Sequence, residues 1–144
     1  MMTIERAAAL GAATLALVIC SLAATASAQE KDITARCAEA AERYQEMTGK
    51  APGDEDVPVV LAYRYVFCPQ KLEVPAGTTV RWVNVEKRTS HSVWFKEAGR
   101  DESDRIFPEE KVELTLDLPA GEHPYLCGPH WESHDMVGMV TITE

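Results

Sequence analysis

The sequence predicts an all-β protein, a Greek-key β-sandwich with an additional N-terminal α-helix. Three observations predict this fold. Apolar residues recur at helical spacing within residues 33–47. From Val57 onward, short runs of alternating apolar and polar residues follow, as in strands with one buried face. Two Pro-Ala-Gly turns, at residues 75–77 and 119–121, separate such runs.

We expect the helix to be amphipathic and to make about four turns over residues 33–47. Asp32 or Thr34 can cap its start, and Gly49 followed by Pro52 ends the pattern. Its apolar stripe consists of Ile33, Cys37, Ala40, Ala41, Tyr44 and Met47. Because Cys37 lies on this stripe, a bond from its sulfur would pin the helix against another part of the fold.

After a connector at residues 51–56, which contains Pro, Gly and three acids, about seven short strands are expected. They are residues 57–67, 71–74, 79–85, 91–95, 112–118, 122–127 and 136–143. This number of short strands, separated by turns, is typical of a Greek-key sandwich.

The first 28 residues are expected to be a cleaved Sec-type signal peptide. Arg6 precedes an apolar stretch at residues 7–24, and the Ala-Ser-Ala sequence at 26–28 matches a cleavage site. A membrane anchor is the competing interpretation. It is disfavoured because the Ala-rich stretch runs into the cleavage pattern without a charged flank. The chain then divides into a signal peptide (1–28), a helix and connector (29–56) and a sandwich domain (57–144) in an exported, periplasmic protein without membrane insertion.

The protein is acidic, with 23 Asp and Glu against 14 Lys and Arg and a formal net charge of −9. Such a surface argues against nucleic acid or anionic lipid as a partner, because both are polyanions. It favours a basic partner, although solubility alone explains the charge equally well.

Cysteine usage adds a constraint. Without Cys20, which leaves with the signal peptide, three cysteines remain: Cys37, Cys68 and Cys127. In an oxidising compartment one of three thiols stays unpaired, and it must be shielded by burial or by a metal. We expect Cys127 to be this thiol and Cys37 to pair with Cys68, with two buried free thiols as the alternative.

The strongest chemical signal is the run Cys-Gly-Pro-His-Trp-Glu-Ser-His-Asp-Met at residues 127–136, with His91 upstream. One thiolate, two imidazoles and a thioether form the ligand set of a trigonal blue-copper site. Soft sulfur stabilises Cu(I), and imidazole suits both oxidation states. The set therefore predicts a one-electron redox centre. Each residue alone also has an ordinary explanation, since histidine and methionine both occur in protein cores.

Five segments together resemble the cupredoxins, in particular the group of plastocyanin, amicyanin and pseudoazurin. They are TVRWVNV at 79–85, SHSV at 90–93, GEHPYLC at 121–127, GPH at 128–130 and MVGMVT at 136–141. The resemblance covers residues 63–144 and leaves the N-terminal helix unexplained. Two separated ligand segments, each followed by the expected pattern, make it specific.

The resemblance implies one copper ion held by His91, Cys127, His130 and Met136. Met139 is a competing axial ligand, but the family's methionine directly precedes a Val-Gly-x-Val strand, which fits Met136. The residues expected to surround and orient these ligands are Asn84, Ser92, Gly128 and Pro129. By the same resemblance, His130 is the port through which electrons pass, and its neighbour Trp131 either enlarges the docking surface or packs within the loop.

Three departures from the family pattern bear on the axial contact and the potential. Five residues separate His130 from Met136, where plastocyanin-like sequences have four. Glu132 and His134 lie in this loop as alternative axial ligands, and a carboxylate ligand would make a red site. The residue after the upstream histidine is commonly Asn in this group and is Ser92 here, so we expect a shifted reduction potential.

The function implied is that of a monomeric periplasmic electron carrier and not an enzyme. Its partners would be redox proteins such as c-type cytochromes or a periplasmic dehydrogenase or reductase. Copper enzymes with this fold need further copper centres and domains. Two alternatives stay open: a red-copper single-domain enzyme and a periplasmic copper carrier or storage protein.

Overall fold

The computed structural model describes residues 13–144, with side chains from Thr25 onward. The chain divides into two units between Ile33 and Thr34, and the described part of the first unit, residues 13–33, is entirely helical. Residues 1–12 of the expected signal peptide lie outside the described residues, so its cleavage stays a prediction. Among the described residues, no helix combines the length and apolar character needed to span a bilayer.

Helix α1 extends over Ala13–Thr48, so the prediction that it starts at a cap on Asp32 or Thr34 is wrong. Residues 13–31 contain neither Gly nor Pro and are rich in Ala and Leu, both strong helix formers, and the helix therefore continues through the cap. The predicted end is confirmed. Gly49 adopts φ 77 directly after Thr48, as glycine commonly does at a helix C-terminus.

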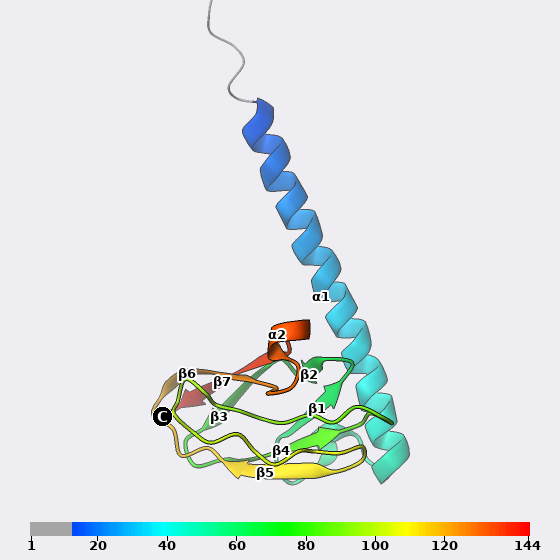
Figure 1. Cartoon of the computed structure of the whole chain (residues 1–144), viewed down its shortest axis with the longest axis vertical. Coiled ribbons are helices and arrows are strands. Elements are labelled where there is room, and N and C mark those ends of the chain that lie inside the picture. The colour runs from blue at the N-terminus through cyan, green and yellow to red at the C-terminus, as the bar shows by residue number, and fades with distance from the viewer. Residues whose placement is uncertain (1–12) are drawn as a thin grey trace, which may run out of the picture. The chain divides into compact units, whose positions relative to one another are not determined.

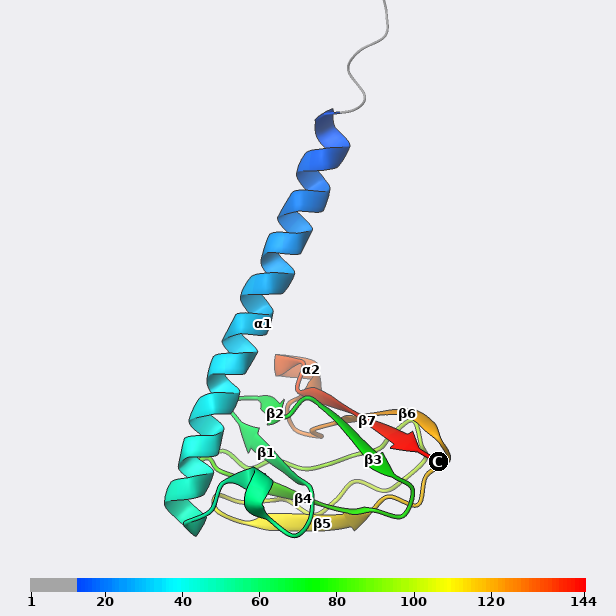
Figure 2. The same cartoon turned by 180° about the vertical axis from the view of Figure 1, so that it is seen from behind.

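The second unit, residues 34–144, is a two-sheet sandwich, which confirms the predicted fold class. One sheet has the strand order β2-β1-β4-β5, and the other has the order β3-β7-β6. Their bounds are β1 Val59–Tyr63, β2 Val66–Cys68, β3 Lys71–Pro75, β4 Thr79–Asn84, β5 Lys111–Thr115, β6 Gly121–Leu126 and β7 Val137–Thr143. Figures 1 and 2 show β4 and β5 on one side of the sandwich and β6 and β7 on the other.

Both sheets are mixed, because β1 runs parallel to β4 and β3 runs parallel to β7. The core between them is built from the inward residues of both sheets. Its largest members are Trp82, Phe67, Phe95 and Tyr125, whose rings pack edge-on or tilted against one another. Such pairs prefer these arrangements because of the ring quadrupole. The aromatic core gives the loops at one end of the sandwich a rigid base.

Two strand predictions need correction. The strand predicted at residues 57–67 is instead a hairpin of two strands, β1 and β2. The chain reverses direction at the two-residue turn Arg64-Tyr65, where both residues adopt positive φ. The sequence hides this turn, since it contains no Gly, Asn or Pro. Residues 91–95 form no strand. They make only two isolated bridges, His91 with Ile106 and Trp94 with Leu126.

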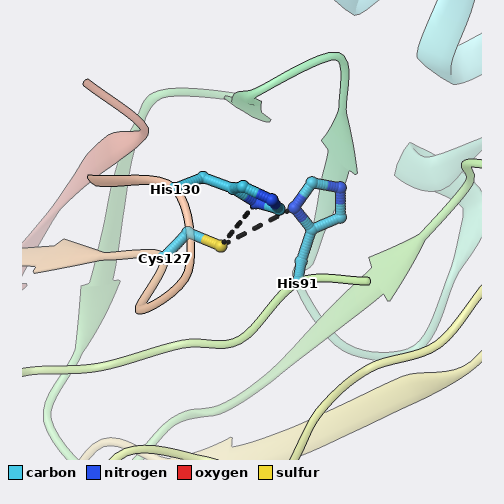
Figure 3. A group of neighbouring side chains, drawn as sticks. All are labelled: His91, Cys127 and His130. Atoms are coloured by element: carbon cyan, nitrogen blue, oxygen red, sulfur yellow. Dashed lines mark hydrogen bonds between the residues drawn. The ribbon is translucent and has the colours of Figure 1, made fainter. Parts of the chain in front are cut away.

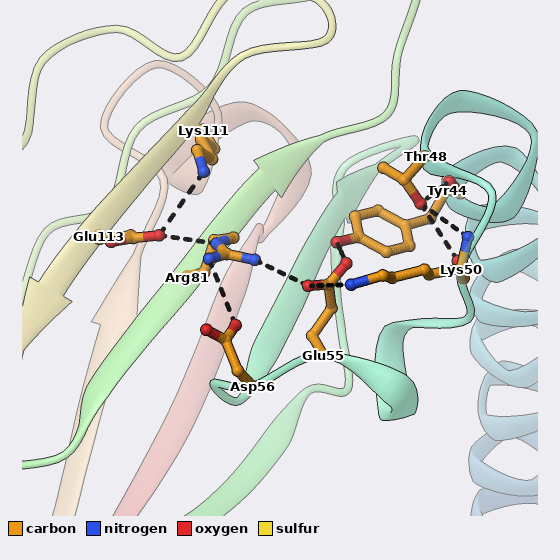
Figure 4. A network of polar contacts seen from close by, with 8 residues as sticks. All are labelled: Tyr44, Thr48, Lys50, Glu55, Asp56, Arg81, Lys111 and Glu113. Carbon is orange, nitrogen blue, oxygen red and sulfur yellow. Dashed lines mark hydrogen bonds and ion pairs between the residues drawn. The ribbon is translucent and has the colours of Figure 1, made fainter.

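The C-terminal part of α1 packs on the sandwich through its apolar stripe, in which Ala40 and Tyr44 are buried. The predicted disulfide between Cys37 and Cys68 is present and joins α1 to β2. A polar network continues this contact (Figure 4): the Tyr44 hydroxyl donates to Glu55 at 2.7 Å, and the Arg81 guanidinium on β4 lies 3.2 Å from the same carboxylate. The hydrogen bond from Tyr44 holds the pKa of Glu55 below its usual value.

Gly138 on β7 lies opposite Tyr125 on β6, and we expect Gly138→Ala to destabilise the protein. A Cβ at this position would lie 2.5 Å from the Tyr125 Oη, and this ring is fully buried and cannot move away. Overpacking of this kind costs about 1–3 kcal/mol, and urea unfolding measures it. Gly53→Ala is the control, because nothing lies within 4 Å of its added methyl group. Equal stabilities for the two variants would contradict the packing argument.

Candidate metal centre

His91 is placed by the chain segment that follows β4. Its backbone N–H donates to Ile106 O at 3.0 Å, and its carbonyl accepts from Ile106 N at 2.8 Å. The buried Asn84 amide holds the same segment from the other side, donating to Thr89 O at 2.7 Å and to Ile106 O at 2.9 Å. The result is a fully buried imidazole on a segment that is hydrogen-bonded at both ends. Asn84 therefore supports the backbone segment that carries His91, and its role in orienting a ligand stays a prediction.

Cys127 follows the last residue of β6, and the loop after it folds back on itself. The His130 N–H donates to Cys127 O at 3.0 Å, and the Cys127 N–H donates to Met136 O at 3.0 Å. Between them, Trp131–His134 forms a short helical turn, α2, which ends at Asp135 in a left-handed conformation. This turn takes up the extra residue of the loop and brings Met136 back beside Cys127.

Three side chains converge at this end of the sandwich (Figure 3). The Cys127 Sγ lies 3.6 Å from His91 Nδ1 and 3.5 Å from His130 Nδ1. All three ligand atoms lie within 4.8 Å of one another. A nitrogen at about 2.0 Å and a sulfur at about 2.3 Å from one metal, at a trigonal angle, are about 3.7 Å apart. The spacing therefore fits a single metal ion between the three atoms.

The electrostatics of the cluster act on metal binding in two opposite ways, because the thiol holds its proton more tightly and the imidazole holds its proton less tightly. Burial raises the pKa of the Cys127 thiol, and contacts with Ser92 and His130 offset only part of this. Burial also lowers the pKa of His130, so this imidazole is neutral and its nitrogen lone pair is free to bind a metal. A thiolate in this position needs a cation to stabilise its charge. Soft thiolate together with imidazole is a donor set that copper prefers.

The structure separates the candidates for the axial position. Met136 is fully buried and belongs to the same core cluster as Cys127. Met139 is three residues further on, within β7, where it is paired with strands on both sides. Glu132 and His134 are exposed, and neither belongs to the three-residue cluster. Met136 is thus the candidate whose placement agrees with the family pattern, and its role as a ligand stays a prediction.

Ser92 joins the two ligand segments. Its buried hydroxyl accepts a 2.9 Å hydrogen bond from the Gly128 N–H and donates at 2.6 Å to the Glu102 carboxylate. A Cβ on Gly128 would collide with that Glu102 carboxylate, so glycine at this position lets the carboxylate stay beside Ser92. Pro129, half-buried, links Gly128 to His130 in the same loop.

Two residues near the site were not singled out from the sequence. Glu86 lies with a carboxylate oxygen 3.4 Å from the outward Nε2 of His91, an atom that has no other polar partner. Although burial raises the pKa of Glu86, its contacts with His91 and with the Arg64 N–H lower it below the usual value. Tyr65 packs its ring against His130. Neither position has a motif of its own, and only the folded hairpin brings Tyr65 to the site.

The expected port residues lie at the rim of the cluster. His130 is half-buried, unlike the buried His91. Trp131 is half-buried too, and the Lys96 ammonium lies 4.7 Å from its ring centroid. Beside it is a cavity of about 540 Å³ lined by Lys96, Glu97, Pro124, Tyr125, Leu126, Trp131 and Val137. Trp131 therefore both packs against Lys96 and lines a surface cavity.

A mixed two-sheet sandwich with a buried His-Cys-His cluster at one end defines a class of small metalloproteins with a single metal centre. Comparison with known proteins gives the family. The sequence profile described as "Copper binding proteins, plastocyanin/azurin family" matches residues 60–143, and this chain belongs to that family. The His-Cys-His cluster is thus a site that can hold a copper ion.

Individual relatives agree. The chain is 29% identical over 90 residues to a plastocyanin from Nostoc punctiforme, a match that covers 53% of this chain and 63% of that plastocyanin, less than two thirds of its length. The amicyanin structure from Paracoccus versutus is 28% identical with a TM-score of 0.53, covering 65% of this chain and 89% of amicyanin. A reduced Cu(I) form of an amicyanin variant is 27% identical with a TM-score of 0.53, covering 65% and 90% of the two chains.

Proposed function

We propose that this protein is an electron carrier that binds one copper ion through His91, Cys127 and His130, with Met136 as the axial ligand. The observation that supports this most directly is the buried Cys127 sulfur with an imidazole Nδ1 at 3.5 Å and another at 3.6 Å. Copper, when bound, supplies one-electron redox chemistry to such a donor set. The chain's own residues hold the ligands, exclude water and offer a surface for partners.

The arrangement of the ligands suits electron transfer because it resists rearrangement. Both ligand segments are tied to the sandwich and to each other, through Asn84 on one side and through the Ser92 hydroxyl between them. The deep ligands, His91 and Cys127, are fully buried above an aromatic core. A site that keeps its shape in both oxidation states needs little reorganisation when an electron enters or leaves.

We place the port for electrons at His130, with the Trp131 surface as the docking area. His130 is the ligand imidazole with access to solvent, and the cavity beside Trp131 is lined mainly by apolar side chains. A port of this kind suits contact with another redox protein, such as a c-type cytochrome or a periplasmic dehydrogenase or reductase. The protein would act as an exported, periplasmic monomer.

The test is a visible and EPR spectrum of the copper-loaded protein. An intense sulfur-to-copper charge-transfer band with narrow copper hyperfine splitting is the expected result. A red spectrum would instead indicate a carboxylate ligand such as Glu132, and rapid loss of copper to a chelator would indicate a copper carrier. Protein that stays colourless after reconstitution under oxidising conditions would contradict the proposal.

We expect Ser92→Asn to shift the reduction potential. The substitution removes the hydroxyl that joins the Gly128 N–H to Glu102, and hydrogen bonds around the ligands tune the potential of a metal site. Protein-film voltammetry of the two proteins measures the shift. Ala120→Asn, in the exposed turn before β6, is the control and should keep the wild-type potential. Equal potentials for Ser92→Asn and wild type would contradict the expectation.

A further inference from the structure

The turn between β1 and β2 is conformationally strained. Its two residues, Arg64 and Tyr65, adopt φ of 44 and 62. Positive φ at both positions is the conformation of a type I′ hairpin turn, which normally contains Asn or Gly because other residues are strained there. Strain of this kind persists only where the surrounding structure enforces it, and it often marks a functional position. The contacts of this turn show what the strained conformation achieves.

Tyr65 lies against the more exposed of the two imidazoles. Its ring is edge-on to His130 at 5.0 Å and stacked on His134 at 3.7 Å with an interplanar angle of 14°. His134 is the last residue of α2, the turn that takes up the extra loop residue. The longer loop thus supplies the ring on which Tyr65 stacks, and Tyr65 in turn limits the orientations open to the His130 ring.

Arg64 contacts the other imidazole through a carboxylate. Its backbone N–H donates to Glu86 Oε1 at 2.6 Å, and the same oxygen lies 3.4 Å from His91 Nε2. A carboxylate on the outward nitrogen of a metal-binding histidine fixes the ring orientation and the tautomer. The two neighbouring turn residues therefore contact both imidazoles of the cluster, one directly and one through Glu86.

Helix α1 holds this turn in place. The Arg36 guanidinium donates to Arg64 O at 3.0 Å, and the Arg64 side chain pairs with Glu39 at 3.0 Å. One residue beyond Arg36, the disulfide from Cys37 fixes α1 to Cys68 at the far end of β2. The helix thus contacts the hairpin at its turn and at its base. Helix α1 is therefore linked to the metal site through the turn at Arg64 and Tyr65.

We propose that the turn Arg64-Tyr65, supported by helix α1, is a positioning device for the two imidazole ligands. Tyr65 restrains His130, and Arg64 sets Glu86 against His91. The proposal rests on the proposed function, because it assigns this role toward a bound copper ion. It also makes a statement about the metal-free protein, in which both rings are already held in the orientation that binds metal.

The experiment compares Tyr65→Gly with Tyr65→Phe in the full chain. Glycine accepts the positive φ and removes the ring, whereas phenylalanine keeps the ring at the same position. Residues that orient metal ligands affect affinity by about 10-fold to 100-fold. We therefore expect copper to pass to an excess of chelator about 10-fold faster from Tyr65→Gly, and within about twofold of the wild-type rate from Tyr65→Phe. Circular dichroism confirms that both variants remain folded during the measurement.

A second readout needs no copper. Imidazole NMR signals of metal-free wild type and Tyr65→Phe should report one ring orientation for His130, and those of Tyr65→Gly should report exchange between orientations. His134→Ala, an exposed substitution, removes the stacking partner and should give the same exchange even if Tyr65→Gly does not fold. Unchanged ring order and unchanged copper release in these variants would overturn the role of Tyr65.

The role of the helix has its own test. Glu39→Gln removes the charge that pairs with Arg64 and should speed copper release in the same direction as Tyr65→Gly but by less, because Arg36 still binds the turn. A wild-type release rate and wild-type ring signals for Glu39→Gln would exclude the ion pair with Arg64, and the same result for Arg36→Ala/Glu39→Gln would exclude the helix from the device. A wild-type protein that gives no sulfur-to-copper band would overturn the proposed function, and the ring signals of the metal-free protein would still decide the positioning.

Discussion

Replacing Cys127 by serine should abolish the intense visible absorption of the copper-loaded protein. The band arises from charge transfer between a thiolate and copper, and Cys127 is the one free cysteine within residues 25–144, whose side chains the structure describes. A serine hydroxyl stays protonated near neutral pH and is a hard oxygen donor, so it stabilises Cu(I) poorly. We expect the loss of essentially the whole band and a fall in copper affinity of more than about 100-fold, because losing a ligand should exceed the effect of losing a residue that only orients one.

The control for this variant is Met139→Leu, which removes a sulfur that lies within β7. Its band should match wild type, because Met136 and not Met139 is the proposed axial ligand. Absorption titration with copper and competition with a chelator measure both quantities. A persistent band in Cys127→Ser would contradict the assignment of Cys127 as the thiolate ligand and the proposal of a one-electron copper centre. A shift of the band or of the reduction potential in Met139→Leu would instead favour that residue as the axial ligand.

Removing the disulfide should give the largest loss of stability. Cys37 and Cys68 are separated by 31 residues, and cross-linking a loop of this length stabilises a protein by about 3 to 4 kcal/mol in the chain-entropy treatment. The double variant Cys37→Ala/Cys68→Ala should lose this amount in urea unfolding of the metal-free protein. Its copper band should persist in the native range, because the His-Cys-His cluster remains.

Glu42→Ala, an exposed substitution on the same helix, is the matched control and should change stability by less than about 0.5 kcal/mol. A loss below about 1 kcal/mol in the double variant would show that the helix holds its position without the bond, through Tyr44, Ala40 and their neighbours.

The sequence predicts the sandwich well because its signals are local. Alternation, turn residues and the end of α1 at Gly49 each depend on a few neighbouring positions, and the structure confirms them. The hairpin at Arg64-Tyr65 was missed because its turn lacks the residues that normally mark positive φ. Residues 91–95 were mistaken for a strand because their apolar pattern reflects burial of Val93 and Phe95 in the main core and not pairing in a ladder.

By itself, the sequence determined the class of fold and the donor chemistry. The donors are the cysteine that remains once Cys37 pairs with Cys68, two histidines at family spacing and a methionine after them. Only the tertiary structure decided which side chains meet. It set the 3.5 Å approach of His130 Nδ1 to sulfur, the burial of Met136 and the contact of Tyr65 with the imidazole. The reason is physical. Ligand identity is a property of single residues, whereas orientation depends on contacts between segments far apart in the chain, which no local pattern records.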